Sequence, residues 1–152
     1  MQSEICFEVS REIAAPVHAV WLVIADYARD HEWREGVHMR QEPPGLARAG
    51  AITHEQLRML GSVHRVSARL EEVIDQRRIV FRTIESDVPV HGVRALEPTR
   101  DGVRVTVRIT MSPRGAWRLV ARPMAAMLRR RFERDLARLA SLVEAPGLRA
   151  SA

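Results

Sequence analysis

Most of this chain follows one repeating pattern, in which apolar and polar residues alternate from Val37 to Met111. Alternation with a period of two is typical of strands that bury one face, and turn-forming residues separate the alternating stretches. With a similar stretch near the start, the pattern predicts strands at 5–13, 37–42, 50–60, 63–74, 79–85, 88–97 and 103–111. Because the connections between successive strands are short, we expect an antiparallel meander.

The residues after Gly115 follow a helical pattern that continues to about Glu144, and Pro123 is expected to kink or reset this helix near its start. Its apolar stripe comprises Leu128, Phe132, Leu136, Leu139 and Val143. Two short helices are expected earlier, from Pro16 to about Ala25 and, capped by Asp26, to about Trp33. One long helix on the concave face of a twisted sheet would bury these stripes, which predicts an α+β fold.

Length and composition restrict the class of protein. A chain of 152 residues, 46% hydrophobic and 28% charged, suits one soluble domain, which we place at 1–145 with a flexible tail at 146–152. The longest apolar run, Ala19 to Ala25, is too short to cross a bilayer, and the first residues lack the basic start and apolar core of a signal peptide. We therefore expect a cytoplasmic protein without a membrane partner.

Residue types and spacings disfavour several kinds of site. Cys6 is the only cysteine, so the chain cannot form an internal disulfide or a cysteine-based zinc site. The histidines lack the spacing of a metal site, and we expect no metal and no other cofactor. The net charge is +5, but the arginines are mostly interleaved with acids, so nucleic-acid binding is not expected.

Four segments carry a resemblance to a known family: IAAPVHAVW, ADYARDHEW, LEPTRDGVRVTVRI and the terminal stretch that begins RLVARPMAAMLRRRF. With them the chain resembles the SRPBCC superfamily, also called START-like, and most closely its polyketide cyclase/dehydratase family. The resemblance implies a helix-grip fold, in which a curved seven-stranded antiparallel sheet wraps around a long C-terminal helix and leaves a cavity between them. It also implies a hydrophobic ligand in that cavity and, in some members, cofactor-independent cyclisation, aromatisation or dehydration.

Strand pairing decides which side chains face this cavity. If Gly61-Ser62 forms a two-residue loop, Glu55 lies opposite Ala68, and a turn at 75–78 places Glu85 on the other side of Ala68. The two glutamates would then face the cavity about 10 Å apart. A carboxyl group in apolar surroundings has a raised pKa and can act as a general acid, so both are candidate catalytic residues. The alternative is that one or both lie at the cavity opening, solvated and paired with arginine.

The strand at 88–97 can be read in two registers. One register points Arg94 inward, where its guanidinium could hold a carboxylate or polarise a ketone. The other points His91 inward, where its imidazole could shuttle protons. The alternative for each is that its side chain is simply exposed, and both are candidate catalytic residues.

The wall of the cavity is predicted from the same inward faces and from the resemblance. The resemblance places Tyr27 and Trp33 at the cavity entrance, where amphipathic aromatic side chains suit a boundary with water. Flexible thioethers at the start of the terminal helix suit an adaptable wall. The remaining candidate ligand-binding residues are Leu57, Met59, His64, Val66, Phe81, Thr83, Val107, Met111, Trp117, Met124 and Met127.

Three functions fit these residues. The first is a polyketide cyclase or aromatase, with a polyketide intermediate supplied free or by an acyl carrier protein. The second is a non-catalytic binding or carrier protein for a lipid-like or polyketide ligand. The third is an interaction protein that uses its arginine-rich long helix. The two inward glutamates favour the first, and the chain could act as a monomer or a homodimer.

Overall fold

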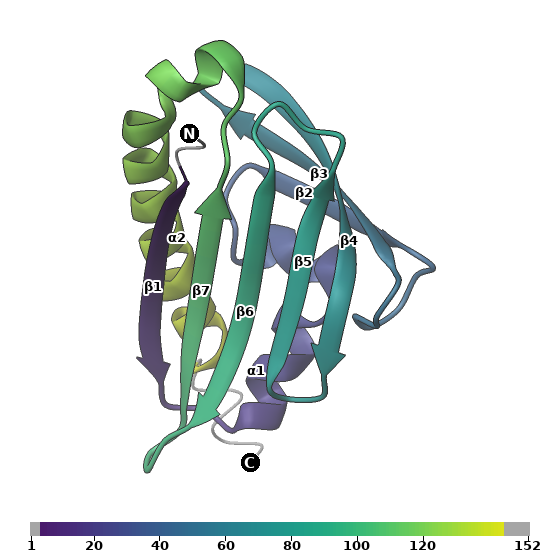
Figure 1. The fold of residues 1–152 in the computed structure, drawn as a ribbon. Helices are drawn as coiled ribbons and strands as arrows, with labels where there is room; N and C mark the ends of the chain where they lie inside the picture. Colours follow the sequence, from purple (N-terminus) through teal and green to yellow (C-terminus); the bar gives the residue numbers. More distant parts are fainter. Residues whose placement is uncertain (1–3, 145–152) are drawn as a thin grey trace.

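In the computed structural model, which describes residues 4–144, seven antiparallel strands form one curved sheet (Figure 1). The strands are β1 Ile5–Ile13, β2 Val37–Glu42, β3 Ile52–Met59, β4 Ser62–Ile74, β5 Arg78–Ile84, β6 Val90–Pro98 and β7 Val103–Met111. The helices are α1 Val17–Ile24, η1 Tyr27–Glu32, η2 Gly115–Leu119 and α2 Ala121–Val143, where η marks 3₁₀-helices. The sheet order is β1-β7-β6-β5-β4-β3-β2.

This architecture confirms the predicted helix-grip fold. The observed strand ends differ from the predicted ends by at most two residues, because alternation and turn residues mark them directly. In β7 the alternation is complete, since Val103, Val105, Val107, Ile109 and Met111 are all buried. The predicted tail at 146–152 lies outside the described residues.

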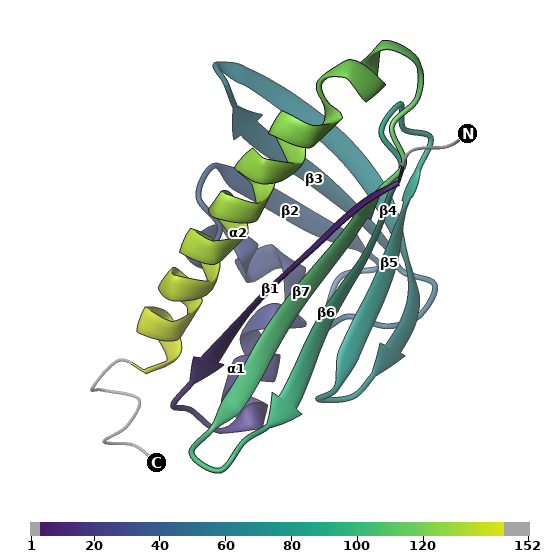
Figure 2. The ribbon, with the colours of Figure 1, turned by 60° about the vertical axis from the view of Figure 1, so that its left-hand side comes forward.

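Helix α2 runs diagonally across the concave side of the sheet (Figure 2). Its predicted apolar stripe is buried only in the second half of the helix, at Leu136, Leu139 and Val143. Leu128 and Phe132, nearer its start, are half-buried. The helix therefore seals one end of the concave face more completely than the other.

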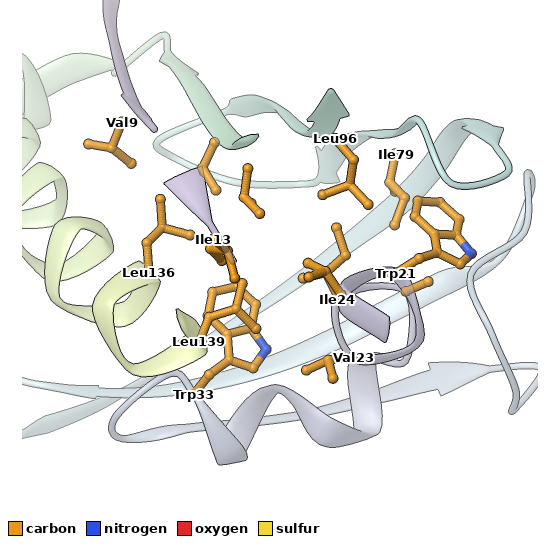
Figure 3. Close-up of a cluster of buried hydrophobic side chains, with 14 of the residues drawn as sticks. Val9, Ile13, Trp21, Val23, Ile24, Trp33, Ile79, Leu96, Leu136 and Leu139 are labelled. Atoms are coloured by element: carbon orange, nitrogen blue, oxygen red, sulfur yellow. The ribbon is translucent and has the colours of Figure 1, made fainter. Parts of the chain in front are cut away.

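The sealed end is also closed by α1 and η1. The side chain of Asp26 accepts a hydrogen bond from the backbone N–H of Ala28 at 3.2 Å, which confirms the predicted helix cap. Ile24 and Trp33 belong to the buried cluster that also contains Ile13 of β1 and Leu139 of α2 (Figure 3). This cluster joins the short helices, the sheet and the end of α2 in one core.

The terminal helical segment consists of two elements. The chain forms η2, breaks at Val120 and starts α2 at Ala121, so Pro123 is the third residue of α2. A proline there removes no helical hydrogen bond, because the first N–H groups of a helix have no partner within it. Pro123 therefore lies just after the break between η2 and α2. This agrees with the prediction that the helix is reset near Pro123, and not with a kink.

The predicted β3–β4 register is wrong by two residues. The two-residue loop is Leu60-Gly61, with positive φ angles of 52° and 77°, and not Gly61-Ser62. Two positive φ angles suit the tight turn that matches the twist of an antiparallel hairpin. Glu55 consequently lies opposite Val66, and Thr53 lies opposite Ala68. Because the shift is by two, every inward residue remains on the inward face.

The predicted β4–β5 register is wrong by one residue next to the turn, where Ile74 pairs with Arg78, and by two residues beyond Leu70. A bulge between Leu70 and Glu72 inserts one extra residue into β4, which the sequence pattern did not reveal. Thr83, and not Glu85, therefore lies opposite Ala68. Glu85 follows the end of β5, with a positive φ of 46°, and is exposed. The prediction that Glu85 faces the cavity is wrong.

The pair Phe81 and Gly92 gives a test of packing on the inward face. The two residues are directly opposite, and a Cβ added to Gly92 would lie 2.1 Å from the Cζ atom of Phe81. We expect Gly92→Ala to lower the free energy of unfolding by about 1–3 kcal/mol, because the ring must leave its place. Denaturant titration should show a smaller loss in a Phe81→Leu background. An equal loss in both backgrounds would contradict this explanation.

Candidate functional site

The inward face of the sheet changes in burial along its length. At the end covered by α1 and η1, Leu70, Ile79 and Val103 are fully buried. At the other end, next to the start of α2, seven inward residues are only half-buried: Leu57, Met59, His64, Val66, Phe81, Thr83 and Val90. We call these seven residues the open end of the concave face.

The open end brings together much of the predicted ligand wall. Six of its residues were predicted from strand parity, namely Leu57, Met59, His64, Val66, Phe81 and Thr83. Met124 and Met127, in the first turns of α2, are half-buried as well. Val107 and Met111 face inward but are buried within the core. Trp117 lies on η2 and is 41% exposed.

Tyr27 and Trp33 do not border an entrance. Their side chains are 3% and 1% exposed, so the predicted position at a boundary with water is wrong. Both rings pack against the guanidinium of Arg94, whose Cζ atom lies 4.3 Å from the Tyr27 ring centre and 5.1 Å from that of Trp33. The two aromatic residues therefore form walls around a buried charge.

Arg94 faces inward, which settles the register of β6. Its Nη1 donates to Asp30 Oδ1 at 3.1 Å and to the carbonyl oxygen of Ile24 at 2.8 Å, and its Nη2 donates to Asp30 Oδ2 at 2.5 Å. Burial alone would lower the pKa of Arg94, but Asp30 and Tyr27 outweigh it, so the pKa lies above its ordinary value. Arg94 is thus a permanent cation whose two Nη atoms bind within the protein.

A second buried arginine extends this network toward the open end. Arg34 Nη1 donates to Asp30 Oδ2 at 3.0 Å, and its Nη2 donates to Glu55 Oε1 at 2.6 Å. Its Cζ atom also lies 5.3 Å from the ring centre of Phe132 on α2. Burial lowers the pKa of Arg34, but the nearby carboxylates of Glu55 and Asp30 raise it by more, so the guanidinium stays charged. We call Arg94, Asp30, Arg34 and Glu55 the buried charge network.

Glu55 is the outermost member of this network. It faces inward, as predicted, and its side chain is 19% exposed. The guanidinium of Arg34 lies directly against it, which agrees with the arginine pairing of the alternative prediction and not with purely apolar surroundings. His64 and Glu55 occupy adjacent inward rows, since Glu55 pairs with Val66 and Leu57 pairs with His64. Glu55 thus connects the buried charge network to the open end.

His91 lies on the outer face of the sheet. It pairs with Arg82 and Thr110, and its Nε2 lies 3.9 Å from Glu71 Oε1. The alternative register that pointed His91 into the cavity is therefore wrong. With Glu85 also outside, the predicted catalytic residues that the structure keeps together are Glu55 and Arg94, joined through Asp30 and Arg34.

Asp30, Arg34 and Asp135 were missed by sequence reasoning. Asp30 and Arg34 are four residues apart, a spacing that signals a possible ion pair, but their burial depends on β3 and β6. Asp135 is a buried residue of α2, and burial raises its pKa even though Arg34 lies near enough to oppose that shift. Within the described part of the chain, the Tyr27 hydroxyl and Trp33 Nε1 are buried without a hydrogen-bond partner.

Two hollows are lined mostly by residues of the outer face of the sheet, although Glu55 and Val66 also line the first. The first, of about 440 Å³, runs between two rows of outward side chains on β2–β4 and is lined by His38, Arg40, His54 and Arg65 among others. The second, of about 310 Å³, crosses β5, β6, β7 and β1. Over residues 4–144, no three metal-ligating side chains are grouped as a metal site, and no helix is long and apolar enough to cross a membrane.

The buried charge network predicts a large stability effect at Asp30. Its side chain is fully buried between two arginines, so Asp30→Asn leaves both cations without their shared carboxylate. We expect a loss of about 3–5 kcal/mol in the free energy of unfolding, measured by denaturant titration. Glu32→Gln is the matched control, because Glu32 forms a more exposed ion pair with Arg29 on the same helix. The control should cost less than about 1 kcal/mol, and equal losses would contradict the prediction.

Comparison with known proteins agrees with this architecture. The aromatase/cyclase Zhui from Streptomyces sp. R1128 is 19% identical, with a TM-score of 0.75 over 93% of this chain and 94% of that chain. TTHA0849 from Thermus thermophilus is 21% identical, with a TM-score of 0.74 over 99% and 100%. The di-domain ARO/CYC protein StfQ of the steffimycin biosynthetic pathway is 15% identical, with a TM-score of 0.75 over 98% of this chain and 53% of that one.

At these identities the structural similarity shows the fold alone. A search of curated proteins found no match. The family described as polyketide cyclase / dehydrase and lipid transport matches residues 4–144, which is nearly the whole chain. The chain therefore belongs to the polyketide cyclase/dehydrase and lipid transport family.

Proposed function

We propose that this protein binds a hydrophobic small molecule, lipid-like or polyketide, at the open end of the concave face. The observation that carries the proposal is the half-burial of apolar side chains that point inward, such as Leu57, Val66 and Phe81. Inward residues at the other end of the same sheet are fully covered by the protein itself. A ligand would remove the exposed apolar surface from water, which is the main favourable term in such binding.

The types of residue around the open end suit the binding of a hydrophobic ligand. Met124 and Met127 supply flexible, polarisable thioethers from the first turns of α2. Glu55 and His64 add two polar groups on the same face, which could orient one polar end of a mostly apolar ligand. The family description covers both polyketide chemistry and lipid transport, and it is compatible with this ligand class.

Non-catalytic binding is the function that the site geometry favours. Of the four predicted catalytic residues, Glu85 and His91 lie outside the concave face, and Arg94 is bound to Asp30 and Ile24. Donor groups already held by buried partners stabilise the fold and are not available to a substrate without breaking those contacts.

Acid–base catalysis of a cyclisation is the second candidate, and Glu55 is the observation that favours it. Its carboxylate lies at the boundary between the buried charge network and the open end, next to the row that contains His64. A carboxylate and an imidazole on one apolar face could take and return the proton of an activated methylene. The substrate would be a reactive poly-ketone, delivered free or by an acyl carrier protein.

A lysine at the open end tests ligand binding. We expect Val66→Lys to lower the affinity for a lipophilic fluorescent probe at least tenfold, because a buried ammonium disfavours an apolar ligand. Val63→Lys is the matched control on the same strand, since Val63 faces outward and is 45% exposed. Probe titration and native mass spectrometry measure the two variants. Equal affinity in wild type and Val66→Lys would exclude this site.

A glutamine at position 55 tests the second candidate. We expect Glu55→Gln to abolish turnover of a poly-ketone substrate while the probe still binds, because glutamine cannot accept the proton. Glu42→Gln, on the exposed end of β2, is the control. Product analysis after incubation separates the outcomes, and thermal unfolding checks that both variants fold. Full turnover in Glu55→Gln would remove the catalytic assignment and leave binding intact.

A further inference from the structure

The short helix η2 has no buried residue, although it contains large apolar side chains. Trp117 is 41% exposed, Leu119 is 85% exposed and Val120, just after the helix, is 46% exposed. Leu60 is 81% exposed in the β3–β4 turn. This turn lies at the same end of the molecule as the start of α2 in both views (Figures 1 and 2). We call Leu60, Trp117, Leu119 and Val120 the apolar tip. Trp117, Leu119 and Val120 lie within four residues of one another, and exposed apolar groups so close together usually mark an interaction site.

The sequence around η2 is strongly basic. Between Met111 and Phe132 there are six arginines and no acidic residue. Three of these arginines, Arg114, Arg118 and Arg122, are exposed and alternate with the apolar residues of η2 and the start of α2. The acidic residues at the same end include Glu85 and Asp87 of the β5–β6 loop, and Glu4, which directly precedes the partner of Met111 in β1. The charge next to the apolar tip on η2 itself is therefore positive.

We propose that the apolar tip docks on an anionic lipid bilayer, with Trp117 and Leu119 among the headgroups and Arg118 and Arg122 against lipid phosphates. Tryptophan and leucine beside arginine are typical of segments that lie in the membrane interface. Each arginine near an anionic surface adds to the attraction, and no spanning segment is needed. We expected no membrane partner because the chain has no segment long enough to span a bilayer, and docking at the membrane interface does not need such a segment.

The shape of the apolar tip favours a bilayer over a protein partner. Leu60 and Leu119 project from two separate elements and are more than four-fifths exposed, so they are protrusions and not the walls of a groove. A bilayer interface accommodates separate projecting side chains, whereas a protein partner would need a matching pocket for each.

The apolar tip is next to the open end of the concave face. Met59 ends β3 directly before Leu60, and Met124 lies one turn into α2 after Val120. Docking in this orientation would turn the open end toward the lipid, so a hydrophobic ligand could move between bilayer and protein with little exposure to water. Docking itself does not require the proposed ligand site.

Vesicle flotation of the full chain tests the proposal. We expect retention on vesicles of phosphatidylcholine with about one third phosphatidylglycerol, little retention on phosphatidylcholine alone, and release as salt rises from about 0.1 M to about 0.5 M. Arg118→Gln/Arg122→Gln should lower the partition coefficient roughly thirtyfold, and Leu119→Ser about tenfold or more. Their matched controls are Arg65→Gln/Arg69→Gln on the outer face and Leu46→Ser on the β2–β3 connection, which should bind like wild type.

Tryptophan fluorescence gives an independent readout. Trp21 and Trp33 are 4% and 1% exposed, so a blue shift on adding anionic vesicles would report Trp117. Trp117→Phe should abolish the shift but largely retain flotation. Val66→Lys, which disables the proposed ligand site, should not lower vesicle retention, because an added cation does not weaken attraction to anionic lipid. Failure of one proposal can thus be distinguished from failure of the other.

Three results would overturn the proposal. The first is equal retention on neutral and anionic vesicles. The second is equal partitioning of wild type and the Leu119→Ser and arginine variants. The third is a dimer in sedimentation equilibrium that Leu119→Ser dissociates, because the apolar tip would then be covered by a second copy of the chain.

Discussion

The carboxylate of Asp30 joins several separate parts of the chain. It accepts hydrogen bonds from Arg94 on β6 and Arg34 after η1, and through these arginines it is connected to the Ile24 carbonyl at the end of α1 and to Glu55 on β3. A fully buried charge must be paired, so these elements are held in one relative position. The rings of Tyr27 and Trp33 pack against the guanidinium of Arg94, so their positions depend on the ion pair between Arg94 and Asp30.

The two ends of the concave face differ because different elements cover them. The short helices and the second half of α2 bury one end and enclose the buried charge network. The first half of α2, with Met124 and Leu128, leaves the other end half-covered. A buried polar network beside a partly open apolar wall fits the ligand binding that we propose. The apolar tip extends this exposed apolar surface beyond the sheet.

The alternation of residues along each strand predicted which side chains face inward, but not which residues lie opposite them on the neighbouring strands. Glu55 and Thr83 face inward as the alternation requires, because an error of two residues preserves the face. Glu85 was misplaced because the bulge in β4 and the end of β5 leave no mark in the pattern. Arg94 and His91 could not be separated from sequence, since both alternating sets of that strand contain polar and apolar residues.

The sequence by itself determined the order of elements, the strand ends and the inward faces, because these depend on local period and turn chemistry. It also contained the arginine-rich, acid-free stretch between Met111 and Phe132. Only the tertiary structure decided that Asp30 and Arg94, which are 64 residues apart, form one ion pair. Whether a side chain is buried or exposed depends on what packs against it, so Trp33 became core and Leu119 remained in solvent.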